Sequence, residues 1–222
     1  MKVVTQSNNF VYLFWALVAL LFSASLVQEL SGTWGEEIFS FVILAMLILS
    51  IKSVRTDFAW KKIFYLLSLV FFILIVIAKF IHVSFLPNLT LLLMMIFFIG
   101  SFWAAYKQIL FEGHVDGNKV IGSISLYLLL GLLWTIIYLL LLQIDPTAFS
   151  GIEEGNWKQN FSQVAYYSFV TLTTLGYGDI LPVNRVAQFF VYMETIMGVF
   201  YMAIIVSSLI SLRLAKLQEE KE

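Results

Sequence analysis

Long apolar runs joined by short polar links make up most of the hydrophobic pattern of this chain. A helix needs about 20 apolar residues to cross a bilayer core of about 30 Å. Most of the runs approach that length, and the polar links between them are too short to hold a soluble domain. The pattern predicts transmembrane helices over residues 10–27, 38–51, 63–81, 89–106, 121–142 and 186–212.

Two of these runs have a rival interpretation. Residues 10–27 could be the core of a signal peptide with the cleavage-like triplet 23–25, but the run is longer than a usual signal core and only Lys2 precedes it. Residues 38–51 are short for a span, unless residues 33–35 extend them and Trp34 anchors the helix at the membrane interface. We expect both runs to be retained spans.

The distribution of basic residues predicts the orientation. With six spans and residues 145–160 outside, Lys79, Lys158 and Arg185 are external. A larger set of basic residues is then internal, as the positive-inside rule requires: Lys2, Lys52, Arg55, Lys61, Lys62, Lys107, Lys119, Arg213, Lys216 and Lys221. The chain is therefore predicted to be a multi-pass cell-membrane protein with both termini in the cytoplasm.

The composition narrows the class further. Hydrophobic residues make up 61% of the 222 residues and charged residues only 12%, as in a membrane protein. The net charge of −1 suggests no nucleic-acid partner, and the absence of cysteine excludes disulfides and thiolate metal sites. No nucleophile–base pair or metal-ligand cluster stands out, so we do not expect an enzyme or a cofactor.

Residues 173–179 read Thr-Thr-Leu-Gly-Tyr-Gly-Asp and resemble the selectivity-filter signature of the potassium-channel family, Thr-Val-Gly-Tyr-Gly-Asp. The only difference is Leu175 in place of the valine. Such a filter replaces the water shell of the ion with rings of backbone carbonyls. Glycine supplies the backbone dihedrals that other residues avoid, which explains Gly176 and Gly178. One chain gives one oxygen per ring, so the motif calls for about four chains.

The resemblance implies K+ coordination at the carbonyls of residues 174–177, with the Thr174 hydroxyl as a further oxygen and the Tyr177 side chain bracing the strand. It also implies a set of residues that support the filter: Tyr166, Tyr167, Thr171 and Asp179. The two tyrosines stand where the family often has tryptophan, and their hydroxyls would bond to Asp179 or Tyr177. Many members have glutamate at the position of Val170, so a carboxylate pair with Asp179 is excluded here.

The resemblance extends from about residue 121 to the end of the chain. It implies an outer helix at about 121–143, a re-entrant pore helix at about 161–173, the filter at 174–179 and an inner helix at about 186–212. We predict an all-α membrane protein with a four-helix N-terminal transmembrane bundle over residues 1–111 and a two-helix potassium-channel pore over residues 112–222. The partners would be three identical subunits and the lipid bilayer.

Two features of the inner helix carry predictions about gating. Gly198 stands where the resemblance implies a hinge, although close helix packing explains a glycine equally well. A stripe of apolar residues with a spacing of four would line the cavity and the inner gate: Met202, Val206, Ile210 and Leu214. Glu194 is an ionisable residue within a span, which is costly, and we expect it behind the filter instead of in the ion path.

The fourth span separates this chain from voltage-gated channels. Those channels carry an arginine at every third position there, whereas residues 89–106 hold no charge. The sequence therefore predicts a homotetrameric potassium channel that is not strongly voltage-gated. The alternatives are a non-conducting or regulatory subunit that assembles with another pore protein, and a transporter component with a filter-like loop.

Overall fold

The computed structural model describes residues 9–29, 34–53, 58–80, 85–111, 117–207 and 211. The chain is almost entirely helical, with one π-helical turn and one pair of two-residue strands. In chain order the elements are α1 (Asn9–Glu29), α2 (Trp34–Ser53), α3 (Phe58–Phe80), α4 (Leu86–Phe111), α5 (Gly117–Ile144), β1 (Phe149–Ser150), α6 (Trp157–Leu172), β2 (Leu181–Pro182), α7 (Arg185–Phe200) and η1 (Tyr201–Val206).

Six of the described helices are long and apolar enough to cross a membrane: α1 to α5, and α7 with its continuation to Ile204. The prediction of an all-α, multi-pass membrane protein is confirmed. The short second run becomes a helix of 20 residues because α2 begins at Trp34. Glu36 and Glu37 lie in its first turn, where the positive end of the helix dipole favours acidic side chains.

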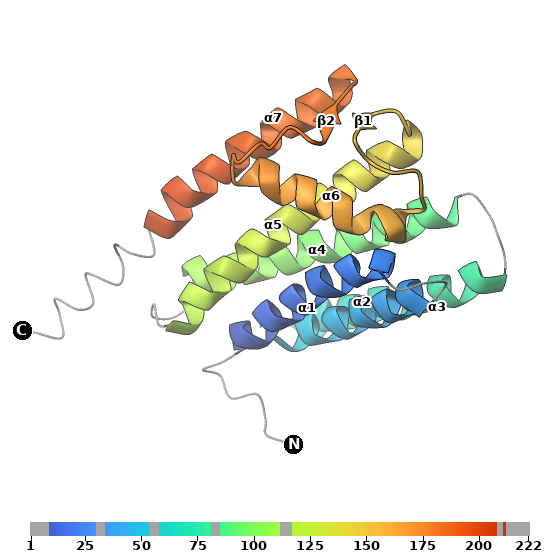
Figure 1. Cartoon of the computed structure of the whole chain (residues 1–222). Helices are drawn as coiled ribbons and strands as arrows, with labels where there is room; N and C mark the ends of the chain where they lie inside the picture. Colours follow the sequence, from blue (N-terminus) through green and yellow to red (C-terminus); the bar gives the residue numbers. More distant parts are fainter. Residues whose placement is uncertain are drawn as a thin grey trace, which may run out of the picture.

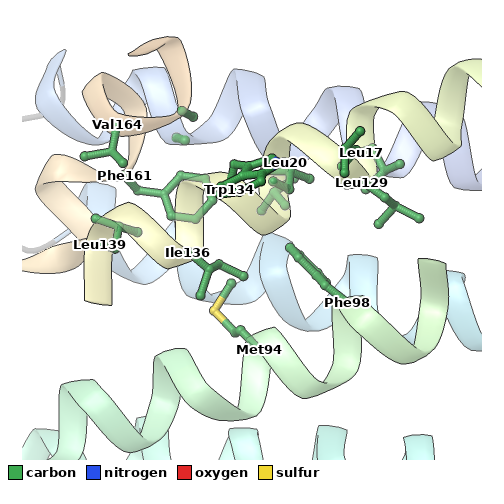
Figure 2. Packing of buried hydrophobic residues seen from close by; sticks show 14 of the residues in the cluster. Leu17, Leu20, Met94, Phe98, Leu129, Trp134, Ile136, Leu139, Phe161 and Val164 are labelled. Atoms are coloured by element: carbon green, nitrogen blue, oxygen red, sulfur yellow. The ribbon is translucent and has the colours of Figure 1, made fainter. Parts of the chain in front are cut away.

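Helix α5 is the centre of the fold. It is the most buried of the six spans, with 61% of its apolar window inside the structure. Figure 2 shows why: labelled side chains from α1, α4 and α6 gather around those of α5. Within a bilayer, van der Waals packing stabilises such contacts, because lipid tails are as apolar as these side chains. In Figure 1, α1 to α3 lie on one side of α5 and α7 lies on the other, while α6 crosses α5 and reaches α1.

The N-terminal bundle and the pore region share this core. Helix α1 packs against both α5 and α6. Near the start of α5, the Asn118 amide donates to Asn9 at 2.7 Å and accepts from the Phe10 backbone at 3.2 Å. The ring of Phe10 also fills the space over Gly122, where a Cβ would lie 2.8 Å from it. The predicted boundary between the two parts falls within residues 112–116, outside the described residues.

A second set of contacts joins α2 to the start of α6. The Glu36 carboxylate accepts from the Asn156 amide at 2.9 Å and from the Gln159 amide at 3.1 Å. Phe39 packs edge-on against Phe161, with the ring centroids 4.9 Å apart. Helix α6 is therefore held by the bundle at its first turn as well as by α5 along its length.

Most of the helices are longer than the predicted runs, and two of the differences in helix boundaries have a local cause. Helix α6 begins at Trp157 instead of 161, because Asn156 and Gln159 form a capping box that satisfies the free N–H groups of the first turn. The predicted inner helix is interrupted, because α7 passes into the π-helix η1 at Tyr201. Helices α3 and α7 are the least buried spans of the single chain, at 22% each.

Candidate functional site

The predicted filter lies directly after α6 and lines an exposed surface of the single chain. The side chains of residues 173–179 are all exposed, whereas Leu172 before them and Ile180 after them are buried. Thr173 is the C-cap of α6, and its backbone N–H bonds to the Phe169 carbonyl at 3.0 Å. The segment is thus anchored at both ends and uncovered between them.

The first part of the segment folds back onto the end of α6. The Val170 carbonyl accepts from the N–H groups of Leu175 at 2.9 Å and Gly176 at 3.3 Å. The Thr171 carbonyl accepts from Thr174 at 2.9 Å. These bonds satisfy carbonyls that every helix leaves unpaired at its C-terminus. They also fix the position of residues 174–176 relative to the end of α6.

Positive and negative φ angles alternate along the segment. Thr174, Gly176 and Gly178 have φ of 60°, 57° and 82°, and the residues between them do not have positive φ. In an ordinary strand successive carbonyls point to opposite sides. Alternation between left- and right-handed dihedrals instead directs successive N–H groups to one side of the chain and the carbonyls to the other. The predicted role of the two glycines, to allow dihedrals that a Cβ penalises, agrees with this geometry.

The left-handed backbone of Thr174 is the feature of the segment that the sequence does not predict. Thr174 is the only non-glycine with positive φ in the described part of the chain. A β-branched residue rarely adopts this region, and holding it there costs about 1–3 kcal/mol. Such strain persists only where the surrounding structure enforces it, here through the bond from its N–H to the Thr171 carbonyl. The residue types around Thr174 do not predict that its φ is positive.

The carbonyl side of the segment is open. A Cβ built on Gly176 or Gly178 would meet no atom within 4 Å. No backbone–backbone hydrogen bond among the described residues ends on a carbonyl of residues 174–178. Backbone carbonyls without a protein partner are potential ligands for a cation.

The two tyrosines that are predicted to support the filter, Tyr166 and Tyr167, face different ways. The Tyr166 ring stacks on that of Tyr177, with centroids 6.5 Å apart and planes 10° apart. Tyr167 points away from the filter and packs between Tyr138 and Phe149, each at 5.4 Å. Tyr166 thus lies beside the predicted filter, whereas Tyr167 connects α6 to α5 and to the loop that contains Phe149.

The loop between α5 and α6, which contains Gly151, packs against Asp179 at the end of the predicted filter. Gly151 has φ of 86°, and a Cβ there would lie 2.2 Å from the Asp179 carbonyl, so only glycine fits. Strands β1 and β2 pair antiparallel beside it, with Phe149 opposite Pro182. The Asp145 carboxylate accepts from Asn184 at 2.7 Å and from Thr147, and these hydrogen bonds lower the pKa of Asp145.

Gly198 lies against the end of α6. A Cβ on Gly198 would lie 2.1 Å from the Leu172 carbonyl oxygen, so α7 approaches the base of the filter as closely as backbone atoms allow. The same carbonyl accepts from the Tyr127 hydroxyl at 3.2 Å. Of the two explanations for this glycine, close packing is the one with a contact in the structure. The regular helix continues through Gly198 and changes only at Tyr201.

The π-helix η1 follows one turn later. The Tyr201 ring packs against Tyr127 with centroids 5.1 Å apart, and its hydroxyl donates to the Ser123 carbonyl. Of the predicted gate residues, Met202 is exposed on the single chain. Val206 ends η1, and nothing is described of its side chain, while Ile210 and Leu214 lie outside the described residues.

Glu194 lies behind the filter, between α7 and the pore helix, as expected. It is completely buried. Its carboxyl group contacts the Tyr138 hydroxyl of α5 and the Ser168 hydroxyl of α6, the latter at 2.6 Å. The sequence could not have indicated these partners, because they lie far from Glu194 along the chain and neither belongs to a motif.

The charged groups at the outer ends of the bundle helices lie together. The Lys79 ammonium pairs with Glu37 at 2.8 Å, and both side chains are well exposed. Burial lowers the pKa of Lys158, and the nearby Glu36 raises it. Lys79 is therefore an exposed helix-end residue in an ion pair, not a charge within the span.

Comparison with known proteins gave one match. Residues 124–213, less than half of the chain, match a family model described as an ion channel. The matched region holds most of α5 and all of α6, the filter segment and α7. No curated protein and no solved structure matched the chain. Residues 124–213 are therefore similar to an ion-channel domain, and the bundle before them lies outside the match.

Proposed function

With residues 124–213 taken as an ion-channel domain, we propose that this chain is one of four identical subunits of a potassium-selective channel that is not strongly voltage-gated. The observation that carries the proposal is the positive φ at every second residue from Thr174 to Gly178. An alternation of left- and right-handed dihedrals would direct successive carbonyls to one side. The carbonyls of residues 174–177, with the Thr174 hydroxyl, would replace the water shell of K+. Permeant K+ is the only ion required.

The subunit number follows from the open side of the filter. One chain offers one carbonyl at each level, and several levels of full coordination need about four chains around one axis. The exposed face of α7 has the apolar surface that such an assembly or lipid would cover, including Phe189, Ile196 and Phe200. The C-terminal end of α6 would then point at the axis with its partial negative charge, which favours a cation.

Orientation and gating complete the proposal. The excess of basic residues in the links assigned to the inside puts both termini in the cytoplasm. Helix α4 has no charged residue before Lys107. Steep voltage dependence requires about 3–4 gating charges per subunit, since one charge is worth about 2.3 kcal/mol per 100 mV. Voltage is therefore not the main stimulus.

The test is single-channel recording from purified protein in a bilayer with asymmetric K+ and Na+. A reversal potential close to that of K+ supports the proposal, and a reversal potential midway between the two ions refutes potassium selectivity. A protein that reaches the bilayer but passes no ion would favour the non-conducting or regulatory subunit. Co-purification with another pore protein would then identify that role.

A further inference from the structure

The buried carboxyl group of Glu194 joins three helices behind the filter. The side chain has 0% exposure and lies where α5, α6 and α7 meet. One of its oxygens contacts the Tyr138 hydroxyl from α5, and the other lies 2.6 Å from the Ser168 hydroxyl of α6. The same Ser168 hydroxyl lies 2.8 Å from the Gly131 carbonyl of α5. These atoms form one chain of three close oxygen–oxygen contacts.

The number of hydrogens available to these three contacts identifies the protonation state of Glu194. Each of the three contacts needs one hydrogen between its two oxygens. The Tyr138 and Ser168 hydroxyls bring one hydrogen each, and the Gly131 carbonyl can only accept. An ionised carboxylate also only accepts, so the third contact would hold two unshielded lone pairs. A protonated Glu194 supplies the missing hydrogen: it donates to Ser168, Ser168 donates to Gly131, and Tyr138 donates to the other carboxyl oxygen.

The helices pack too closely for these oxygen atoms to move apart and remove the need for the third hydrogen. A Cβ on Gly131 would lie 2.5 Å from the Phe169 ring, so α5 and α6 touch at the glycine itself. That approach fixes the distance from the Gly131 carbonyl to Ser168. The carbonyl also accepts from the Thr135 hydroxyl at 2.8 Å, so the hydrogen of that hydroxyl is already used.

The surroundings of Glu194 favour a neutral acid as well. The other titratable side chains that face it are phenols, Tyr127 and Tyr138 from α5 and Tyr167 from α6. No cation contributes to its environment within the described part of the chain. A buried charge without a partner is costly, and more so at membrane depth.

The chain of contacts ends close to the filter. Ser168 lies half a helical turn before Val170, whose carbonyl holds the backbone of Leu175 and Gly176. One turn further along both helices, Gly198 of α7 meets the Leu172 carbonyl of α6. Helix α7 therefore touches α6 at two successive turns, once through a hydrogen bond and once through backbone packing.

We propose that Glu194 is a positioning residue of the filter that acts as a neutral carboxylic acid, donating its hydrogen to Ser168 and so fixing the end of α6 to α5 and α7. The inference deepens the proposed function and rests on it. Its role is to hold α6 in the position in which the Val170 carbonyl accepts hydrogen bonds from the backbone of residues 174–176.

Substitution separates the neutral acid from a carboxylate. In Glu194→Gln the amide N–H donates to Ser168 and the amide carbonyl accepts from Tyr138, so the K+/Na+ permeability ratio should stay within about twofold of wild type. In Glu194→Ala both hydrogen bonds of the carboxyl group are lost, and the ratio should fall by about tenfold or more. Glu29→Gln, at an exposed position at the end of α1, is the matched control. A Gln variant as defective as the Ala variant would overturn the proposal.

Infrared spectroscopy tests the protonation state without relying on transport or on the Ala variant. Purified wild-type protein should show the C=O stretch of a protonated carboxylic acid, which should vanish in Glu194→Gln and persist in Glu29→Gln. A spectrum in which this band is missing from wild type overturns the inference. Wild-type channels that fail to discriminate K+ from Na+ refute the proposed function, whereas selective wild-type channels with a defective Gln variant refute this inference alone.

Discussion

Replacing Gly198 with alanine would place a methyl group where α7 meets the end of α6. The new Cβ would lie 2.1 Å from the Leu172 carbonyl oxygen and 3.0 Å from its carbon. An ordinary carbon–oxygen contact is about 3.3 Å or more, so the two helices must separate by about 1 Å. The displaced carbonyl also accepts the hydroxyl of Tyr127, and that hydrogen bond would be weakened.

The free-energy terms for Gly198→Ala oppose each other. Alanine favours a helix over glycine by about 1 kcal/mol. Overpacking costs about 1–3 kcal/mol, and this contact belongs to the severe end because a backbone atom cannot turn aside. The weakened bond from Tyr127 costs about 1 kcal/mol more. We expect a net destabilisation of about 2–3 kcal/mol, with the displacement centred on the base of the filter.

Thermal unfolding of the purified protein, followed by tryptophan fluorescence, measures this effect. At this chain length each kcal/mol corresponds to about 2–4 °C in the unfolding midpoint. The matched control is Gly117→Ala at the start of α5, where a Cβ meets nothing within 4 Å. The Gly198 variant should unfold well below this control and lose K+/Na+ discrimination. A variant as stable as the control, selective, but altered in opening would refute the packing argument and favour a hinge.

Three further outcomes test the rest of the proposal. Gly178→Ala should abolish selective K+ current while the protein still reaches the membrane, because φ of 82° is strained for alanine; retained selectivity would remove the filter assignment. Open probability should be nearly flat from about −100 to +100 mV, and a steep curve that flattens in Lys79→Gln would contradict this. Cysteines placed at Lys61 and Glu153 should label from the cytoplasmic and the external side, and labelling from one side would show that a span is missing.

The spans and the filter were accessible from sequence because each depends on local pattern. Helix formation over apolar runs of sufficient length needs no knowledge of distant residues. The second helix was predicted over residues 38–51 with a possible extension through 33–35, and it begins at Trp34. The left-handed dihedrals of Gly176 and Gly178 follow from the chemistry of the motif itself. The capping box of Asn156 and Gln159 was also readable, but the polar residues around it suggested a loop.

The remaining features depend on neighbours that the sequence does not reveal. Thr174 has positive φ because the end of α6 holds its N–H, and no residue type signals that. Glu194 was expected behind the filter, but its contacts with Tyr138 and Ser168 arise only when three helices pack. Gly198 was ambiguous for the same reason, since a hinge and a close contact require the same residue.

The π-helix η1 changes the phase of the inner helix. An α-helix turns by about 100° per residue, and a turn closed by i→i+5 bonds contains one residue more than an α-turn. Ser207 and Ser211, which follow η1, are therefore rotated by about 100° from where uninterrupted counting from α7 would put them. The four-residue stripe that begins at Met202 assumes that uninterrupted count. Conversion of η1 to a regular turn would thus rotate Ser207 and Ser211 about the helix axis and turn other side chains toward the axis of the proposed channel, while Gly198 stayed in place.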